Sequence, residues 1–238
     1  MSLKIFSKGK SEADVYIYDV IGDHWGTGVL AKDFVKEVSN LKVDTLNVHI
    51  NSPGGNAFDG IAIYNTLIQY KGNVVVFIEG LAASAASLVA MAGNEINMAE
   101  NAFIMIHEVW SFVCGNANDL RKEADRLDML SEKYAEVYTK RSNGKKSASE
   151  FFDMMKEETW MDAVEATNAG IVDNITDSIK AAAKFDLSRY NYKNIPNPVK
   201  EQFSMPLPVA LRARLAAMDM AIAHMHNAAA KRQGKTHR

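Results

Sequence analysis

The chain has 238 residues, of which 47% are hydrophobic and 24% charged, and its 27 basic residues nearly balance its 29 acidic residues. A chain of this length forms one or two domains with a substantial core, while a net charge of −2 argues against a general nucleic-acid binder. The single cysteine, Cys114, excludes an internal disulfide and a cysteine-based zinc site, which indicates a reducing, cytoplasmic compartment.

The first 14 residues are polar and lack the apolar run of a secretory signal. Later apolar runs are too short, or too rich in small residues, to span a membrane, so we expect no membrane partner. The histidines are scattered along the chain, and we therefore expect no metal site and no cofactor.

Strand and helix patterns alternate over the first 110 residues. Runs rich in β-branched residues at 15–21, 45–51 and 73–80 alternate with helical patterns at 31–41 and 57–70. A helix of small residues follows at 85–92, and a further apolar run occupies 102–106. Single helices between strands predict parallel strands joined by right-handed crossovers, which is an α/β fold.

Longer helices dominate the middle of the chain. From Asn118 to Arg141, apolar residues recur at steps of three and four, which predicts a long amphipathic helix. Ser147 with Glu150 predicts a capping box at the start of the next helix. Asp162 with Glu165 predicts another, in front of a helix that Gly170 can end.

Prolines mark the C-terminal part of the sequence. Four of the five prolines lie between Pro196 and Pro208, which indicates a linker or an extended strap. A second apolar stripe begins at Leu211 and precedes a basic end. We expect it to form a helix that packs on its own subunit or a neighbouring one, with a coiled-coil or scaffold-binding role as the alternative.

Three motifs carry residues that could perform chemistry. The turn Asn51–Gly55 reads NSPGG and follows a predicted strand, so its glycines can bring backbone amides close to a ligand. Ser84 lies where the strand at 73–80 gives way to a helix, a suitable position for a nucleophile. His107 ends the apolar run at 102–106. Parallel strands would bring all three to one edge of the sheet.

Each motif also has a purely structural interpretation. The NSPGG sequence is compatible with an ordinary turn, and Ser84 or Ser87 could be a helix cap or a small packing residue. A lone histidine at a strand end is commonly a hydrogen-bonded structural residue. The order of the three motifs along the chain favours a catalytic site over three independent coincidences.

Together these motifs resemble those of the Clp protease proteolytic subunit (ClpP) family. The matching segments are NSPGG at 51–55, GLAASAAS at 80–87 and MIHEV at 105–109. The resemblance continues through the long helix to WMDAVEA at 160–166 and NAGIVD at 168–173, and it covers about residues 13–180. It implies a ClpP/crotonase-like spiral of β-α units, with a protruding helical handle and a C-terminal helical extension.

The resemblance also implies roles for individual residues. Ser84 corresponds to the nucleophile and His107 to the general base of a serine endopeptidase. The amides of Gly55 and Ala85 correspond to the oxyanion hole, and we expect Gly54 to contribute to substrate binding. A serine hydroxyl needs such a base and such donors because it is a weak nucleophile on its own. Ser87 is the competing nucleophile.

The third triad member is expected at Glu158, where the family usually has aspartate. Glutamate can orient an imidazole, although its extra methylene requires the backbone to lie farther away. The structural interpretation of Glu158 is a solvated acid at the end of a charged helix. Other acidic candidates in this region of the sequence are Asp153, Glu157, Asp162 and Asp173.

The resemblance extends to partners. The predicted handle is too long for its apolar stripe to be covered by its own subunit, which predicts a homo-oligomer, and family members suggest heptameric rings. Only residues 1–14 precede the first expected strand, which argues against the axial loops that engage a hexameric ATPase. Glu158, the following Thr159–Trp160 and the C-terminal extension resemble the head-maturation proteases of bacteriophages and prophages, which implies capsid or scaffold proteins as substrates.

These expectations divide the chain into a polar N-terminal segment at 1–14, a protease domain at 15–180 with its handle at 112–157, a strap at 181–208, and a helix with a basic tail at 209–238. An unperturbed histidine pKa of about 6.5 predicts that activity rises between pH 6 and 8. The alternatives are a non-catalytic assembly protein of the same fold, a crotonase-type acyl-CoA enzyme and a Ser-Lys peptidase.

Overall fold

The computed structural model describes residues 3–7, 9, 11–23, 28–179 and 185–203. The described residues belong to one compact unit. The predicted C-terminal helix at 209–238 therefore lies outside the described residues. In the described part of the chain, no helix is long and apolar enough to cross a bilayer.

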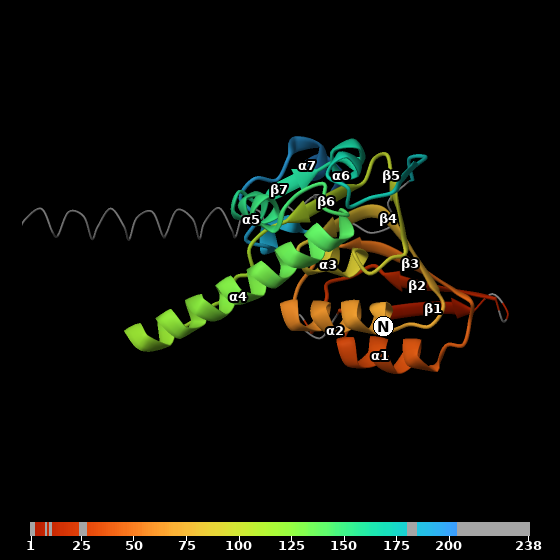
Figure 1. The fold of residues 1–238 in the computed structure, drawn as a ribbon, viewed down its shortest axis with the longest axis horizontal. Helices are drawn as coiled ribbons and strands as arrows, with labels where there is room; N and C mark the ends of the chain where they lie inside the picture. The colour runs from red at the N-terminus through yellow and green to blue at the C-terminus, as the bar shows by residue number, and fades with distance from the viewer. Residues whose placement is uncertain (1–2, 8, 10, 24–27, 180–184, 204–238) are drawn as a thin grey trace, which may run out of the picture. The chain divides into compact units, whose positions relative to one another are not determined.

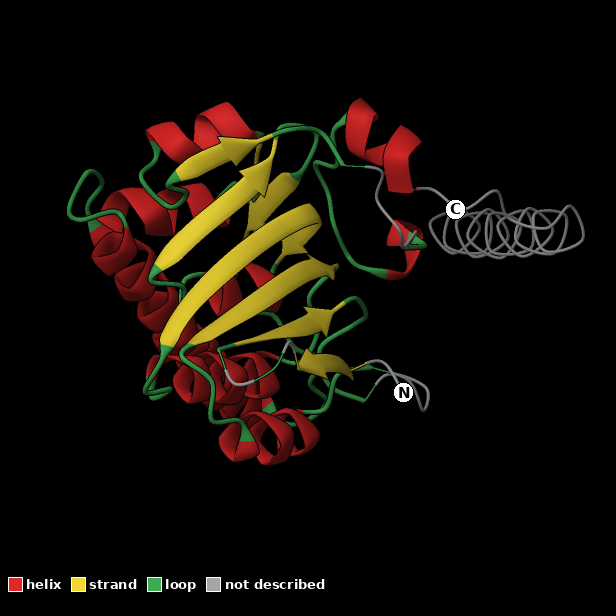
Figure 2. Cartoon of the chain, turned by 90° about the vertical axis from the view of Figure 1, so that its right-hand side faces the viewer, coloured by secondary structure: helices red, strands yellow, loops and turns green. Residues whose placement is uncertain are grey.

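This unit is built on a sheet whose main path runs β1-β2-β3-β4-β5-β8. The pairs β2/β3, β3/β4, β4/β5 and β5/β8 are parallel, and β1 is antiparallel to β2. The strands are β1 (Leu3–Ser7), β2 (Glu12–Ile17), β3 (Thr45–Ser52), β4 (Asn73–Ala83), β5 (Glu95–Ala99), β6 (Phe103–Ile106), β7 (Thr159–Met161) and β8 (Asn174–Thr176). Figure 2 shows these strands as one twisted sheet, with most of the helices gathered on one of its sides.

Strand β4 is long enough to pair with two different strands on one side. Its first half pairs with β5, from Val75 to Ile78, and its last three residues, Leu81 to Ala83, pair with β6. Strand β7 then pairs antiparallel with β6. This branching brings the ends of β4, β6 and the start of β7 together, where the candidate site lies.

The helices begin where the sequence provides caps. The capping boxes of Ser147 with Glu150 and of Asp162 with Glu165 are both formed, as predicted. The helices are α1 (Ala31–Asn40), α2 (Ala57–Ile68), α3 (Ala85–Ala90), α4 (Ala117–Arg141), α5 (Ala148–Lys156), α6 (Ala163–Asn168), α7 (Asn197–Phe203) and the 3-10 helix η1 (Leu187–Arg189). The predicted handle corresponds to α4 with α5, and Figure 1 shows the first half of α4 projecting beyond the sheet.

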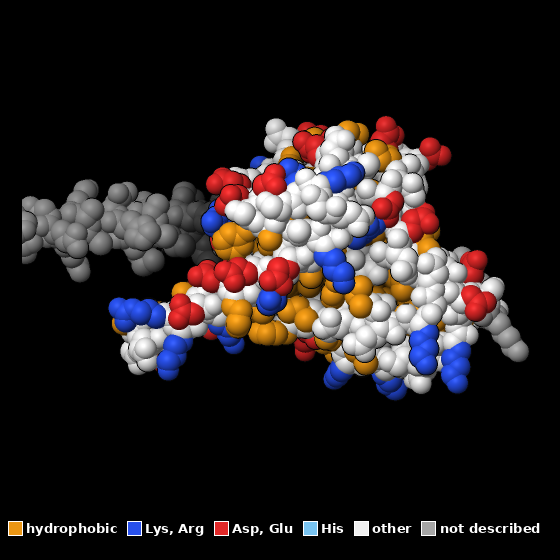
Figure 3. Space-filling view, viewed as in Figure 1, with side chains coloured by type: hydrophobic (Ala, Val, Ile, Leu, Met, Phe, Trp, Pro, Cys, Tyr) orange, Lys and Arg blue, Asp and Glu red, His pale blue; other side chains and the backbone are white. Residues whose placement is uncertain are grey.

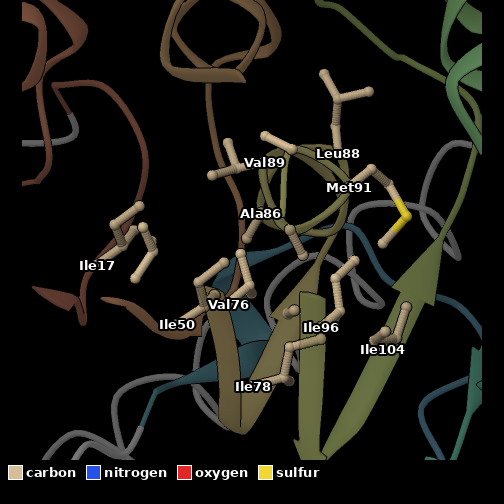
Figure 4. Packing of buried hydrophobic residues seen from close by; sticks show 14 of the residues in the cluster. Ile17, Ile50, Val76, Ile78, Ala86, Leu88, Val89, Met91, Ile96 and Ile104 are labelled. Atoms are coloured by element: carbon tan, nitrogen blue, oxygen red, sulfur yellow. The ribbon is translucent and has the colours of Figure 1, made fainter. Parts of the chain in front are cut away.

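The main core lies between the sheet and the helices, with α3 at its centre. Figure 4 shows Ala86 and Val89 of α3 in one cluster with strand residues such as Val76 and Ile96, all of them fully buried. The small side chains of α3 allow its backbone to approach the sheet closely. This close packing holds the start of α3 at the carboxyl end of β4.

The N-terminal segment differs from the sequence expectation. Residues 1–14 are not only a polar tail, because Leu3–Ser7 forms β1 and pairs with β2, which already starts at Glu12. The segment expected to be a linker or an extended strap is packed against the sheet in its described part. Residues 185–203 pack against β4 and β6 through a second cluster of buried residues, namely Leu81, Ala83, Met105, Leu187, Val199 and Phe203.

Candidate active site

Ser84 occupies a sharp turn between β4 and α3. Its backbone has φ 54° and ψ −124°, a conformation that side chains with a β-carbon rarely adopt. Its amide donates to the Met105 carbonyl at 2.9 Å, which ties the turn to β6. Gly54 lies so close that an added β-carbon would be 2.5 Å from the Ala83 oxygen. The turn therefore exposes the hydroxyl next to the glycine loop.

His107 follows β6 and reaches the Ser84 side chain. The Ser84 Oγ and His107 Nε2 atoms are 2.7 Å apart. With the ring proton on Nδ1, the hydroxyl donates to Nε2, which is the arrangement of a nucleophile with its general base. The pairing of Ala83 with Met105 sets this distance, because it places the residues that follow both strands at one edge.

The surroundings of His107 lower its pKa to about 4. Burial is the main cause because it disfavours the charged imidazolium; the negative charge of Glu158 opposes the shift, and the positive charge of Lys193 adds to it. The ring is therefore neutral at pH 7 and able to accept a proton. This corrects the expectation of an ordinary histidine pKa.

Glu158 lies beside His107 by strand register. Ile106 pairs with Thr159 in the antiparallel β6/β7 ladder, so the residues flanking that pair are neighbours. Glu158 is only 6% exposed and has φ 52°. Its position just after the end of α5 is one at which helices favour glycine.

The Glu158 carboxylate accepts hydrogen bonds from neighbours other than His107. The Lys193 and Asn194 amides donate to Oε1 at 2.7 Å each, Lys193 also donates to Oε2 at 2.9 Å, and Trp160 Nε1 donates to Oε1 at 3.2 Å. Of these described contacts, none joins Glu158 to the His107 ring. Glu158 thus acts on the imidazole through its charge in this conformation.

Two backbone amides at the site have no recorded acceptor among the described residues. Gly55 lies in a bridge with Ile21, in which the Gly54 oxygen accepts from the Ile21 amide at 2.7 Å and the Asn56 amide donates to the Ile21 oxygen at 2.8 Å. The Gly55 amide between them is free of any acceptor in this part of the chain, and so is that of Ala85, the first residue of α3. Ala85 directly follows Ser84 in the chain, and Gly55 lines the same pocket as Ser84.

A pocket of about 410 Å³ opens beside Ser84 and His107. One wall comes from α4 and another from Tyr190 and Tyr192. Its apolar lining includes Phe58, Val109, Trp110, Phe112, Leu127 and Leu130. Figure 3 shows hydrophobic side chains gathered alongside α4 on this side of the molecule. The pocket can bind an apolar side chain next to the serine-histidine pair.

The family model for Clp protease matches residues 1–179 of the chain. The chain belongs to the Clp protease family. Because this family consists of peptidases, the protein is a peptidase, that is, a hydrolase.

A solved Clp structure supports the fold of this Clp protease. A point mutant of ClpP1 from Listeria monocytogenes matches with a TM-score of 0.59 and 24% sequence identity, covering 69% of this chain and 91% of that one. The match supports the predicted α/β spiral with its handle. Because the Clp and crotonase folds are related, the structural match alone does not separate a Clp protease from a crotonase-type enzyme. The family match favours the Clp protease.

The other residues considered from sequence have structural roles in this Clp protease. Ser87 is fully buried, donates to the Ser84 carbonyl at 2.6 Å and shares a hydrogen bond with the Tyr138 hydroxyl at 2.8 Å. The alternative acids do not face His107. Asp153 pairs with Lys156, Glu157 is an exposed C-cap, Asp162 is an N-cap, and Asp173 pairs with Arg141 and accepts from the Ile96 amide.

Two residues at the site escaped sequence analysis. Tyr192 packs its ring edge-on to His107, with 5.6 Å between ring centroids, and the Lys193 amide holds Glu158. Both lie beyond residue 180, where the resemblance ends. Their only sequence signal is the cluster of aromatic residues just before the prolines. Among the described residues, no group of three or more His, Cys, Asp or Glu side chains is arranged to hold a metal ion.

Proposed function

We propose that this Clp protease is a serine endopeptidase in which Ser84 is the nucleophile and His107 the general base. The observation that carries the proposal is the 2.7 Å contact between Ser84 Oγ and His107 Nε2 at a strained strand-to-helix turn. The free amides of Gly55 and Ala85 form the oxyanion hole, and Gly54 lines the substrate-binding edge. Glu158 is the acid of the triad.

Acylation begins when Ser84 Oγ attacks the scissile carbonyl carbon and its proton moves to His107 Nε2. The carbonyl electron pair moves onto oxygen, where the amides of Gly55 and Ala85 stabilise it. The C–N bond then breaks as the electrons return, and His107 delivers its proton to the leaving amine. Water hydrolyses the acyl-enzyme by the same route, giving up its proton to His107 and regenerating Ser84.

Glu158 contributes by stabilising the imidazolium that forms during each step. Its negative charge opposes the effect of burial on the His107 pKa. The site is partly shielded from water, so this charge acts in a medium of lower dielectric than bulk solvent. Because the carboxylate already accepts from Lys193 and Asn194, its position is fixed before substrate binds.

Substitution of the two serines tests this proposal. Ser84→Ala should abolish peptide cleavage and covalent labelling by a fluorophosphonate, because both require the Oγ nucleophile. Ser87→Ala should retain labelling, since its hydroxyl bonds to Ser84 O and Tyr138 and faces no substrate. Mass spectrometry of the labelled peptide measures both results. Labelling that persists in Ser84→Ala would place the nucleophile elsewhere, and an unlabelled wild-type ring would support a non-catalytic assembly protein.

The substrates we infer are capsid or scaffold proteins of a phage or prophage, processed by a homo-oligomer of heptameric rings. The support for the substrates is the resemblance of Glu158, Thr159 and Trp160 to head-maturation proteases. The support for rings is the largely exposed first half of α4, which projects beyond the sheet in Figure 1. No ATPase partner is part of this proposal. To test the substrate proposal, wild type and Ser84→Ala are each co-expressed with the capsid proteins encoded by neighbouring genes, and mass spectrometry identifies the termini of those capsid proteins. Uncut capsid proteins beside an active protease would contradict the proposal.

A further inference from the structure

The strap residues 190–194 form one side of the candidate active site. They are anchored from both ends, because Leu187 and the α7 residues Val199 and Phe203 are buried against β4 and β6. Between these anchors, Tyr192 packs edge-on to His107 and to Trp160, each at 5.6 Å between centroids. The strap therefore lies against catalytic groups as part of the packed unit.

The Tyr192 hydroxyl donates a hydrogen bond to the carbonyl oxygen of Pro53. This carbonyl can only accept, so the single phenolic proton is used there. Tyr192 thus joins the strap to the glycine turn, which lies beside Ser84.

The Pro53 carbonyl matters because of where it lies in the turn. It belongs to the peptide plane that enters Gly54, whereas the Gly54 carbonyl and the Gly55 amide share the next plane. Gly54 has φ 86° and Gly55 has φ 145°, and glycines can rotate out of such conformations at little steric cost. Ile21 holds the second plane through Gly54 O at 2.7 Å. Tyr192 holds the first through Pro53 O, and Ser52 Oγ holds its other end by accepting from the Gly54 amide at 3.1 Å.

We propose that Tyr192 is a positioning residue of the active site, whose hydroxyl fixes the Pro53 peptide and thereby keeps the Gly55 amide directed at the substrate carbonyl. This inference rests on the proposed peptidase mechanism. The strap leaves the pocket beside Ser84 open, since Tyr190 and Tyr192 form one of its walls together with Gly55. The strap therefore completes the site and does not block it.

Tyr192→Phe removes this hydroxyl and keeps the ring. The matched control is Tyr70→Phe, which deletes another tyrosine-to-carbonyl hydrogen bond, from Tyr70 Oη to Val43 O at 3.0 Å, far from the site in sequence and in fold. The full-length variants are compared by kcat and KM on a peptide substrate and by the rate of fluorophosphonate labelling. All rates are divided by the concentration of active sites, which is measured by titrating Ser84. Loss of folded protein then does not count as loss of activity.

We expect kcat and the labelling rate of Tyr192→Phe to fall about tenfold, less than the roughly hundredfold or greater fall that follows loss of a direct oxyanion donor. KM should change by less than about twofold, because the pocket wall is retained, and the low-pH limb of the rate profile should not move. Tyr70→Phe should leave both rates unchanged. A merely structural role of Tyr192 would leave the normalised kcat unchanged.

Two results would overturn the inference. Equal rates in Tyr192→Phe and wild type would remove the role of the hydroxyl, and faster rates would show that it restrains Ser84. In the first case, lower activity of Tyr192→Leu would show that only the packing of the ring matters. An unlabelled wild-type protein would instead refute the proposed peptidase mechanism, so the two failures are distinguishable.

Discussion

At the scale of single residues, the site is marked by backbone conformations that are costly for its side chains. Three residues other than glycine have positive φ among those described: Ser84, Asn143 and Glu158. Asparagine tolerates this region because of its short amide side chain, but serine and glutamate gain nothing from it locally. The strain at Ser84 and Glu158 is therefore evidence that their side chains are needed where they are.

In the proposed mechanism, the pKa of His107 determines how activity depends on pH. Because its pKa is lowered to about 4, the ring loses its proton as pH rises through about 4 and is already in the basic form at pH 6. We expect kcat/KM to be nearly flat between pH 6 and 8 and to fall below about pH 5. A pH series of peptide cleavage measures this; a titration centred at about 6.5 would show that His107 is more exposed in the working enzyme.

Replacement of Glu158 tests its electrostatic role. Glu158→Gln keeps the size of the side chain and removes the charge that opposes the lowering of the His107 pKa. We expect kcat to fall by about tenfold to a hundredfold, and the low-pH limb of kcat/KM to move to still lower pH. The folded state should lose about 1–3 kcal/mol, because the strap amides lose a charged acceptor.

The control for this variant is Glu157→Gln, which changes the exposed neighbour of Glu158. It should alter neither kcat nor the pH profile. Equal effects of the two substitutions would mean that net charge near the strap matters and that Glu158 has no special role.

At the scale of elements, one strand organises the molecule. The first half of β4 pairs with β5 and its end pairs with β6, so one continuous strand contributes both to the core and to the site. On the face of β4 opposite the core, Glu79 contacts His49 of β3, with 2.9 Å between Oε1 and Nδ1. His49 itself stacks between Tyr16 and Phe77.

This face of the sheet should make stability depend on pH. Burial, aided by the nearby charge of Asp14, raises the Glu79 pKa from 4.5 to about 7. The folded state then binds this proton more tightly than the unfolded state does, so Glu79 stabilises the fold below about pH 4.5 and that contribution is lost as pH rises towards 7. Glu79→Gln should flatten the dependence of the unfolding free energy on pH over this range.

Urea unfolding at several pH values measures the effect, with Glu12→Gln at the exposed start of β2 as the control. The control should keep the slope of wild type. An unchanged slope in Glu79→Gln would show that the carboxyl titrates normally.

At the scale of the whole molecule, α4 is the feature that its own subunit leaves uncovered. Its buried residues, Ser131, Tyr134, Ala135 and Tyr138, all lie in its second half. In its first half, Leu120 remains 44% exposed, and Ala124, four residues later on the same side of the helix, is also exposed. An apolar stripe of this kind needs a partner, and another copy of the chain is the partner that the ring proposal supplies.

A charge on this stripe should weaken assembly. Leu120→Asp is expected to lower the sedimentation coefficient at a given concentration while leaving the melting temperature of the subunit within about 2 °C, since the side chain is largely exposed within it. Lys122→Asp places the same side chain about 200° away around the helix and should assemble as wild type does. Identical sedimentation of the Leu120→Asp protein and wild type would remove α4 from the interface.

Sequence patterns predicted those parts of the molecule that local rules determine. The capping boxes located α5 and α6, and the order of parallel strands brought Ser84 and His107 to one edge, because both follow strands that end there. The strand at Leu3–Ser7 was missed because it is short and lies in an otherwise polar segment, where only its pairing with β2 defines it as a strand. The contacts of Tyr192 and the low pKa of His107 depend on how distant segments pack, which no local pattern records.

The backbone at Ser84 also sets two selective pressures against each other. Glycine would occupy that φ and ψ without strain, so folding alone favours loss of the hydroxyl on which the proposed peptide cleavage depends. A copy of the gene that is no longer selected for proteolysis could come to encode a more stable but inactive protein through substitution of this one codon. Serine at position 84 is thus explained by its proposed role in catalysis, because the backbone conformation there favours glycine.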